Sequence, residues 1–196
     1  MDVPQLIAGL QQGNPDAFRQ LVETYQSRVY NTVLAIVRQP EDAEDVAQEV
    51  FVQVFESIHT FGGEGKLTAW IYRIATTKAL EAYRKRHARK RFAFFTSLFT
   101  SDEEGIFDDR LHPVDFAHPG VKLEQQERAK VLFGAIDGLS DQQKTAFTLH
   151  NIEGLSYQEI TEVLQVSLSA VESLLHRAKV NLRKRLANNY KEDNGL

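Results

Sequence analysis

The chain has 196 residues, of which 42% are hydrophobic, with no cysteine and a formal net charge of −4. This length and composition suit one large or two small folded domains and exclude disorder throughout. Without cysteine there is no disulfide and no thiolate zinc site, and the six histidines have no paired ligand spacing, so we expect no metal and no cofactor. No stretch approaches the roughly 20 apolar residues of a membrane span, and the first residues lack an export signal. We expect a cytoplasmic protein with no membrane contact of its own.

Apolar residues recur at helical spacing along most of the chain, and no segment has the alternation of a strand. Asn14 followed by Pro15 is typical of a helix start, and Pro40 before Glu41 and Asp42 is another. The pattern predicts an all-α fold. The expected helices cover about 3–12, 15–37, 41–59, 67–90, 122–137, 141–152, 156–164 and 168–187.

The helix expected at 41–59 has two stripes. The first is apolar, which predicts packing against a domain core, and it consists of Ala43, Val46, Ala47, Val50, Phe51, Val54, Phe55 and Ile58. A second stripe is acidic at its start and contains one apolar residue that the core does not need. This stripe is either a solvated face with acids that suit the helix dipole, or a binding surface for a partner. Its members are Asp45, Gln48, Glu49 and Val52.

Positive charge is concentrated between Lys66 and Arg91, where nine Lys or Arg accompany the single acid Glu81. The segment starts with an apolar stripe and ends in a basic block, which predicts a helix that contacts phosphates. Six such contacts to a duplex would give a salt slope of about −5. The aromatic residues in and near this segment, Trp70 among them, fit core packing better than base stacking, although exposed rings could stack on bases.

Helical periodicity fails after the basic block, where glycines, prolines and a cluster of acids follow. This predicts a flexible linker between two small helical domains. Its aromatic residues, such as Phe107 and Phe116, predict docking on its own domain or on a partner. The expected divisions are a domain at 1–93, a linker at 94–121 and a domain at 122–190.

The segment LSYQEITEVLQVSLSAVESLLHRAK predicts a helix-turn-helix in the C-terminal domain. Ser156 and Glu159 fit a capping box at the first helix, and Ser167 or Ser169 could cap the second. In such a motif the second helix enters the major groove of DNA by its N-terminal residues. An ordinary helical hairpin is the alternative.

Three segments, DAEDVAQEVF, WIYRIATTKALEAYRKR and the helix-turn-helix, follow one another in the order found in one known family. Together they resemble the ECF (extracytoplasmic function) group of bacterial RNA polymerase sigma factors. The resemblance covers nearly the whole chain. It implies a region 2 domain that binds core RNA polymerase and the minus-ten element of promoter DNA, and a region 4 domain that binds the minus-thirty-five element. It also implies an anti-sigma factor as a partner, and a protein that is not itself an enzyme.

The resemblance also implies roles for individual residues. The surface that meets core polymerase would consist of Asp45, Gln48, Glu49 and Val52. Minus-ten contacts and promoter melting would involve Phe61, Gly62, Lys66, Trp70, Tyr72, Arg73, Thr77, Lys78, Glu81, Arg84, Lys85 and Arg86. Minus-thirty-five contacts would involve Ser156, Ser167, Ser169, Ala170, Glu172, Ser173, His176, Arg177 and Lys179.

Four positions depart from the pattern of the family. Thr77 and Glu81 stand where Asn and Asp are usual, so the base preference at the minus-ten element is open. Glu172 and Leu174 stand where many relatives have Lys and Arg, which predicts weak upstream binding without polymerase. The acidic linker resembles the segment that relatives thread through the polymerase cleft.

Three rival functions follow from the same residues. The first is a repressor or activator that uses the helix-turn-helix without polymerase. The second is a nucleic-acid enzyme with the carboxylates of 41–49 as metal ligands, which lacks a distant acid or histidine to complete a site. The third is a sigma-like protein that has lost promoter recognition.

Overall fold

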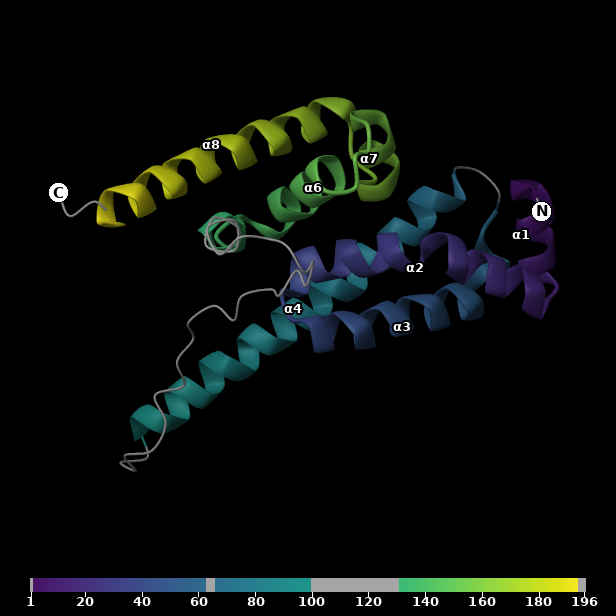
Figure 1. Cartoon of the computed structure of the whole chain (residues 1–196), viewed down its shortest axis with the longest axis horizontal. Coiled ribbons are helices and arrows are strands. Elements are labelled where there is room, and N and C mark those ends of the chain that lie inside the picture. Colours follow the sequence, from purple (N-terminus) through teal and green to yellow (C-terminus); the bar gives the residue numbers. More distant parts are fainter. Residues whose placement is uncertain (1, 63–65, 100–130, 194–196) are drawn as a thin grey trace, which may run out of the picture.

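The computed structural model of the chain describes residues 2–62, 66–99 and 131–193, with side chains as far as residue 89 in the second range and residue 187 in the third. Within these ranges the regular elements are all helices (Figure 1). The all-α fold class is confirmed. The expected linker acids and the phenylalanines at 107 and 116 lie outside the described residues.

The N-terminal domain begins with a helical pair whose ends are set by local capping. Helix α1 (Val3–Gln11) is capped by Asp2, and α2 (Pro15–Val37) by Asn14, whose side chain accepts a hydrogen bond from the Asp16 amide at 2.9 Å. Arg38 ends α2 in the left-handed conformation, with a φ of 67°. The domain continues through α3 (Pro40–Ser57), the short 3₁₀ turn η1 (Ile58–Thr60) and α4 (Leu67–Phe99).

Helix α4 ends nine residues later than the sequence pattern predicts, at residue 99 rather than 90. Loss of apolar periodicity marks the end of packing against a core, but it does not end a helix. The basic block is rich in Arg, Lys and Ala, which are strong helix formers, and no glycine or proline occurs before Gly105. The backbone therefore remains helical beyond the domain core.

One apolar core holds the N-terminal domain together. It is formed by buried side chains of α1, α2, α3, η1 and α4, with Leu21, Val29, Val50, Val54 and Ile71 all fully buried. The expected inner stripe of α3 is therefore confirmed as its core face, except at Phe55, whose side chain is 52% exposed.

The C-terminal domain consists of a helical stretch at 131–137 followed by α6 (Asp141–Asn151), α7 (Tyr157–Leu164) and α8 (Leu168–Asp193). The helix expected at 122–137 is confirmed for 131–137, and its first part lies outside the described residues. Helix α8 ends six residues beyond the expected 187.

The two domains are in contact (Figure 1), with α7 against α4 and α6 against α2. Ala69 and Tyr72 of α4 are buried in the same apolar cluster as Ile160 and Val163 of α7. Part of the N-terminal domain therefore completes the core of the C-terminal one.

Candidate nucleic-acid interface

The outer stripe of α3 is exposed. Val52 retains 55% of its surface, whereas Val50 and Val54, two positions away on either side, retain none. The face opposite the core is thus free to bind a partner. A shallow depression of about 490 Å³ on this face is lined by Asp45, Gln48, Glu49, Val52, Gln53, Glu56 and Lys78.

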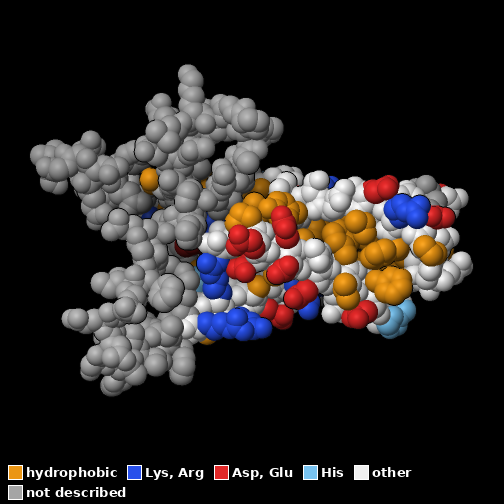
Figure 2. All heavy atoms as spheres, turned by 60° about the horizontal axis from the view of Figure 1, so that its bottom comes forward, with side chains coloured by type: hydrophobic (Ala, Val, Ile, Leu, Met, Phe, Trp, Pro, Cys, Tyr) orange, Lys and Arg blue, Asp and Glu red, His pale blue; other side chains and the backbone are white. Residues whose placement is uncertain are grey.

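Next to these acids lies an apolar patch. Phe55 is 52% exposed and its ring meets Phe18 of α2 edge-on, with the centroids 5.3 Å apart. Figure 2 shows acidic and apolar side chains side by side on this face of the molecule. A partner that combines basic and apolar side chains would match it.

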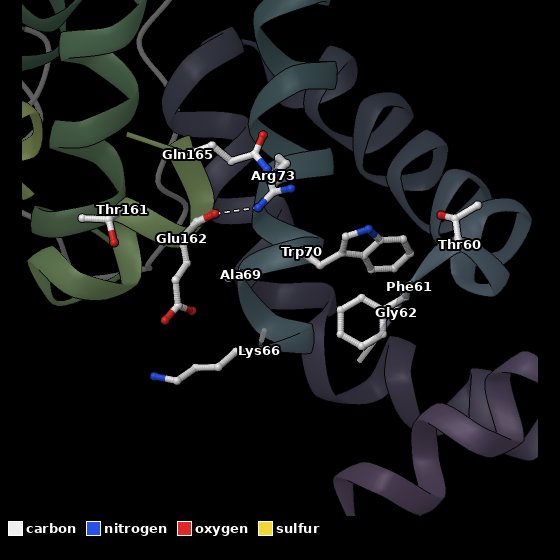
Figure 3. A pocket seen from close by; sticks show the side chains of 10 residues that line it. All are labelled: Thr60, Phe61, Gly62, Lys66, Ala69, Trp70, Arg73, Thr161, Glu162 and Gln165. Carbon is white, nitrogen blue, oxygen red and sulfur yellow. Dashed lines mark hydrogen bonds between the residues drawn. The ribbon is translucent and has the colours of Figure 1, made fainter. Parts of the chain in front are cut away.

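The start of α4 carries an aromatic pair. Phe61 and Trp70 lie with their ring centroids 5.4 Å apart, on the wall of a pocket of about 530 Å³ between α4 and α7 (Figure 3). Phe61 is 6% exposed, which confirms for this ring the prediction of core packing over base stacking. Trp70 is half-buried, so the prediction is confirmed only in part for its ring. Gly62 is exposed, and the rest of its loop, 63–65, lies outside the described residues.

Among the residues expected at the minus-ten element, Arg73 and Tyr72 form hydrogen bonds to the C-terminal domain. The Arg73 guanidinium donates to the main-chain carbonyls of Glu162 at 2.6 Å and Val163 at 3.3 Å, at the C-terminal end of α7 (Figure 3). The Tyr72 hydroxyl donates to Glu153 Oε2 at 2.8 Å. Burial raises the pKa of Tyr72, and the Glu153 carboxylate raises it further.

Other cations of α4 form ion pairs. Lys66 Nζ lies 3.5 Å from Glu159, and the Arg84 guanidinium lies 2.8 Å from Asp141, both across the domain contact. Within the N-terminal domain, two pairs join α4 to α3, namely Lys78–Glu49 at 3.7 Å and Arg86–Asp42 at 2.9 Å. Thr77, Glu81 and Lys85 are exposed, as are the ion-paired Lys66 and Arg84.

The helix-turn-helix is confirmed as α7, a turn at 165–167, and α8. Ser156 and Glu159 form the predicted capping box, and these hydrogen bonds lower the pKa of Glu159. Gln165 turns the chain in the left-handed conformation, and Ser167 Oγ accepts from the Ala170 amide at 3.3 Å. The cap of the second helix is therefore Ser167.

The first turns of α8 present a polar face to solvent. Leu174 is 8% exposed and packs in the domain core, so of the two departures in this helix only Glu172 lies on the exposed face. Ala170 is half-buried. The other exposed candidates are Ser156, Ser167, Ser169, Ser173, His176, Arg177 and Lys179.

Sequence reasoning missed a charged cluster between α2, α4 and α6. Asp137 forms two ion pairs. Its Oδ2 lies 3.0 Å from Arg38 Nη1, and its Oδ1 lies 3.5 Å from Lys144 Nζ. Lys144 has no exposed surface, and its ammonium lies 3.7 Å from the centre of the Tyr83 ring. Arg38 also donates to the Phe133 carbonyl. The other buried residues of α6 are uncharged. The position of Lys144 among them is the one signal in the sequence that could have predicted its burial.

Burial shifts the pKa values in this cluster. Desolvation lowers the pKa of Lys144 and of Arg38, while Asp137 opposes the shift in both. Desolvation also raises the pKa of Tyr83. The cluster therefore places two cations and one shared carboxylate where water is largely excluded.

The described residues contain neither a candidate metal site nor a candidate membrane span. They contain no group of three or more His, Asp or Glu arranged to hold a metal ion, so the acids of 41–49 find no further ligand there. No helix in the described ranges is long and apolar enough to cross a bilayer.

Comparison with known proteins identifies the family. The Sigma-70 region 2 model matches residues 21–89, and the Sigma-70 region 4 model matches 130–182. The ECF RNA polymerase sigma-E factor of Haemophilus influenzae is 32% identical over 184 residues, covering 92% of this chain and 93% of that protein. SigW, an ECF sigma factor of Bacillus subtilis, is 28% identical over 186 residues, covering 95% and 97%.

Two solved structures share the fold. CnrH, solved with the cytosolic domain of CnrY, has a TM-score of 0.66 at 23% identity and covers 93% of this chain and 96% of that one. RpoE of Bartonella quintana, solved with the anti-sigma factor NepR, has a TM-score of 0.60 at 19% identity and covers 87% and 96%. With both regions matched in order over nearly its full length, the chain belongs to the ECF sigma factors, which bind core RNA polymerase and direct it to specific promoters.

Proposed function

We propose that three separate surfaces of the chain carry out this function. The outer face of α3, with Asp45, Glu49 and Val52, binds core polymerase. Helix α4 and the loop before it bind and melt the minus-ten element. The N-terminal turns of α8 bind the minus-thirty-five duplex. This assignment is supported by the exposure of the α3 and α8 faces opposite their buried ones.

Strand opening would be driven by binding, without catalysis by the chain. A flipped base costs a few kcal/mol of unstacking, which contacts to Trp70 and to the polar residue Thr77 would offset. Exposed Lys85, with Arg84 and Arg86 once these leave their acid partners, would hold the phosphates of the opened strand. The protein would then act as a non-enzymatic initiation factor in the cytoplasm.

We assign these functions to the divisions expected from the sequence, which are region 2 at 1–93, a connecting segment at 94–121 and region 4 at 122–190. The extension of α4 to residue 99 supports a later start for the connecting segment. An anti-sigma factor is the proposed regulator, and CnrH and RpoE, which share the fold, were each solved with another protein.

One observation carries the melting proposal. The aromatic pair of Phe61 and Trp70 lies beside Gly62, at the start of the helix with the highest density of positive charge. An aromatic pocket next to a basic helix suits an unstacked base followed by a phosphate chain.

Run-off transcription tests the function. Core polymerase with this protein, on genomic fragments from its source, should yield new transcripts that share two spaced upstream elements. On one such promoter, Thr77→Ala and Lys85→Ala should leave holoenzyme assembly unchanged and reduce the permanganate reactivity of thymines near the start site. Binding of core without any transcript would instead favour a sigma-like protein that has lost promoter recognition, and failure to bind core would favour a repressor or activator.

A further inference from the structure

Helix α1 lies before the residues that the Sigma-70 region 2 model matches, yet it contacts the aromatic pair of Phe61 and Trp70. The model covers residues from 21 onward, whereas α1 ends at Gln11. Gln11 Nε2 donates a hydrogen bond to the main-chain carbonyl of Phe61 at 3.1 Å, across 50 positions of sequence. The N-terminal helix is therefore connected to one of the two rings on the wall of the pocket in Figure 3.

Phe61 is held at its amide, its ring and its carbonyl. The amide donates to the Ile58 carbonyl at 3.0 Å, which closes the turn η1, and the ring packs in the core of the N-terminal domain. The carbonyl accepts from Gln11, and the next residue, Gly62, is exposed. The hydrogen bond from Gln11 thus fixes the peptide group between Phe61 and Gly62, where the chain leaves the core.

The position of Gln11 is set by the packing of α1. Leu6 and Leu10 bury their side chains in the N-terminal core. Gly9 faces α2 so closely that a Cβ at this position would lie 2.9 Å from the Cβ of Ala17. Two carbon atoms in contact prefer a separation of about 3.5–4.0 Å, so α1 can lie this close to α2 only because residue 9 has no side chain. The donor group of Gln11 therefore extends from a helix with a defined position.

Burial of the glutamine does not account for this hydrogen bond. Gln11 is exposed, so water could satisfy its amide, and its side chain adds little to the core. The bond instead holds a peptide group at the edge of the aromatic pair. A flipped base binds more tightly when the groups that receive it are already in place, because less conformational freedom is then lost on binding.

From these contacts we propose that Gln11 is a positioning residue for promoter melting. Its amide fixes the peptide that joins Phe61 to Gly62, and this keeps Phe61 and Trp70 in the arrangement that receives an unstacked base. Gln11 acts through Phe61 and does not itself contact DNA. This inference rests on the proposed role of the aromatic pair in minus-ten melting.

Gln11→Glu tests the proposal with little change of shape. The carboxylate matches the amide in volume but cannot donate, so the Phe61 carbonyl loses its partner. Gln12→Glu places the same charge on the next residue, which is exposed, and is the matched control. The probe is a forked promoter duplex with unpaired minus-ten nucleotides, bound to holoenzyme made with each variant. Gln11→Glu should weaken binding about fivefold, as expected for one hydrogen bond, and Gln12→Glu should leave it unchanged.

Removal of the captured base separates positioning from a general loss of structure. A series of the same probe, with an abasic site at each unpaired position in turn, should identify one position where wild-type holoenzyme loses most affinity. On that abasic probe Gln11→Glu should bind as wild type does, because no base is left to position, and the two changes are then non-additive. A fivefold loss on both probes would overturn the proposal, as would equal affinities of Gln11→Glu and wild type for the intact probe.

Two further measurements guard against a variant that merely unfolds. Gln11→Lys keeps a donor, so it should bind the intact probe as tightly as Gln12→Lys does, and a fivefold loss relative to that control would refute the role of the hydrogen bond. Trp70 is the single tryptophan of the chain. Its fluorescence in the free protein should change in Gln11→Glu but not in Gln12→Glu, while the helical circular dichroism of both matches wild type. Unaltered Trp70 fluorescence in Gln11→Glu would also overturn the proposal.

The abasic probes distinguish this inference from the proposed function. If no abasic site weakens binding of wild-type holoenzyme, capture of a base is itself refuted, and the positioning role falls with it. If one abasic site does weaken binding but its effect adds to that of Gln11→Glu, only the role of Gln11 is refuted.

Discussion

The ammonium of Lys144 lies 3.7 Å from the centre of the Tyr83 ring, where a helix of the C-terminal domain meets α4. The lysine is fully buried, and its counter-charge is Asp137, which also pairs with Arg38. Asp137 is thus the carboxylate that both buried cations share, and Asp141 adds a weaker attraction for Lys144.

This relationship predicts unequal effects of removing its members. Asp137→Ala should lower the free energy of unfolding by about 3 kcal/mol, because it leaves buried charges uncompensated. Lys144→Met should lower it by less, because Asp137 keeps Arg38 as its counter-charge and the buried lysine is replaced by an apolar side chain of similar volume. Urea unfolding of both variants checks the order, and a larger loss for Lys144→Met would contradict it.

The α3 surface predicts a binding defect without a folding defect. Val52→Ser should weaken binding to core polymerase by about 1.5 kcal/mol, or slightly more than tenfold in Kd, because it removes an apolar side chain from the interface. Thermal stability should not change, since Val52 is 55% exposed. Val3→Ser is the matched control, being 57% exposed on α1. Equal affinities of the two variants for core would remove Val52 from the interface.

The basic end of α4 predicts a change in salt dependence. Replacing Arg84, Lys85 and Arg86 with Ala should flatten the plot of log affinity against log salt for the holoenzyme by about 3 units, at all promoter sequences. Titration of labelled promoter DNA at several salt concentrations measures this slope. Arg19→Ala removes an exposed arginine of α2 and should leave the slope intact. An unchanged slope in the triple variant would place this part of α4 away from DNA.

Glu172 predicts a gain of DNA affinity. It is exposed on the first turns of α8, for which we propose contact with the minus-thirty-five duplex, and there its carboxylate would repel phosphates. Glu172→Lys should strengthen binding of the holoenzyme to a duplex with the minus-thirty-five element and alter its sequence preference. Glu23→Lys makes the same charge change on α2 and serves as the control. If the two variants bind alike, Glu172 points away from the duplex.

The capping box of α7 predicts a pH dependence. Hydrogen bonds from Ser156 hold the pKa of Glu159 below its ordinary value of 4.5. A group with a lowered folded pKa stabilises the protein above its unfolded pKa, and this stabilisation is lost as the pH falls through the folded value. Glu159→Gln should therefore lower the unfolding midpoint at pH 7 more than at pH 3.5. Glu172→Gln, on the exposed face of α8, should show no such difference, and a pH-independent loss for Glu159→Gln would contradict the account.

Local signals in the sequence predicted most of the fold. Asn14, Ser156 and Ser167 cap helices as their residue types indicate, and the inner and outer stripes of α3 separate as its periodicity indicates. Such features depend on neighbours within one or two turns, which a sequence displays directly.

The contact between the domains could not be predicted in this way. Tyr72 and Glu153 are 81 positions apart, and nothing local to either one indicates the other. The acceptors of Arg73 are carbonyls, which every residue possesses, so no residue type marks them. Helix α4 extends beyond its predicted end because the loss of apolar periodicity marks only the end of core packing. A solvated segment of good helix formers continues as a helix without a core.

The carbonyl acceptors of Arg73 also limit how the contact between the domains can be lost by substitution. A point substitution in α7 changes a side chain but leaves the main-chain oxygens of Glu162 and Val163 in place. Substitutions that weaken the contact should therefore be few at those two positions and more frequent at Asp141 and Glu153, where the side chain is itself the acceptor. Arg73 donates both of these hydrogen bonds, so it is the position at which one substitution removes the two together.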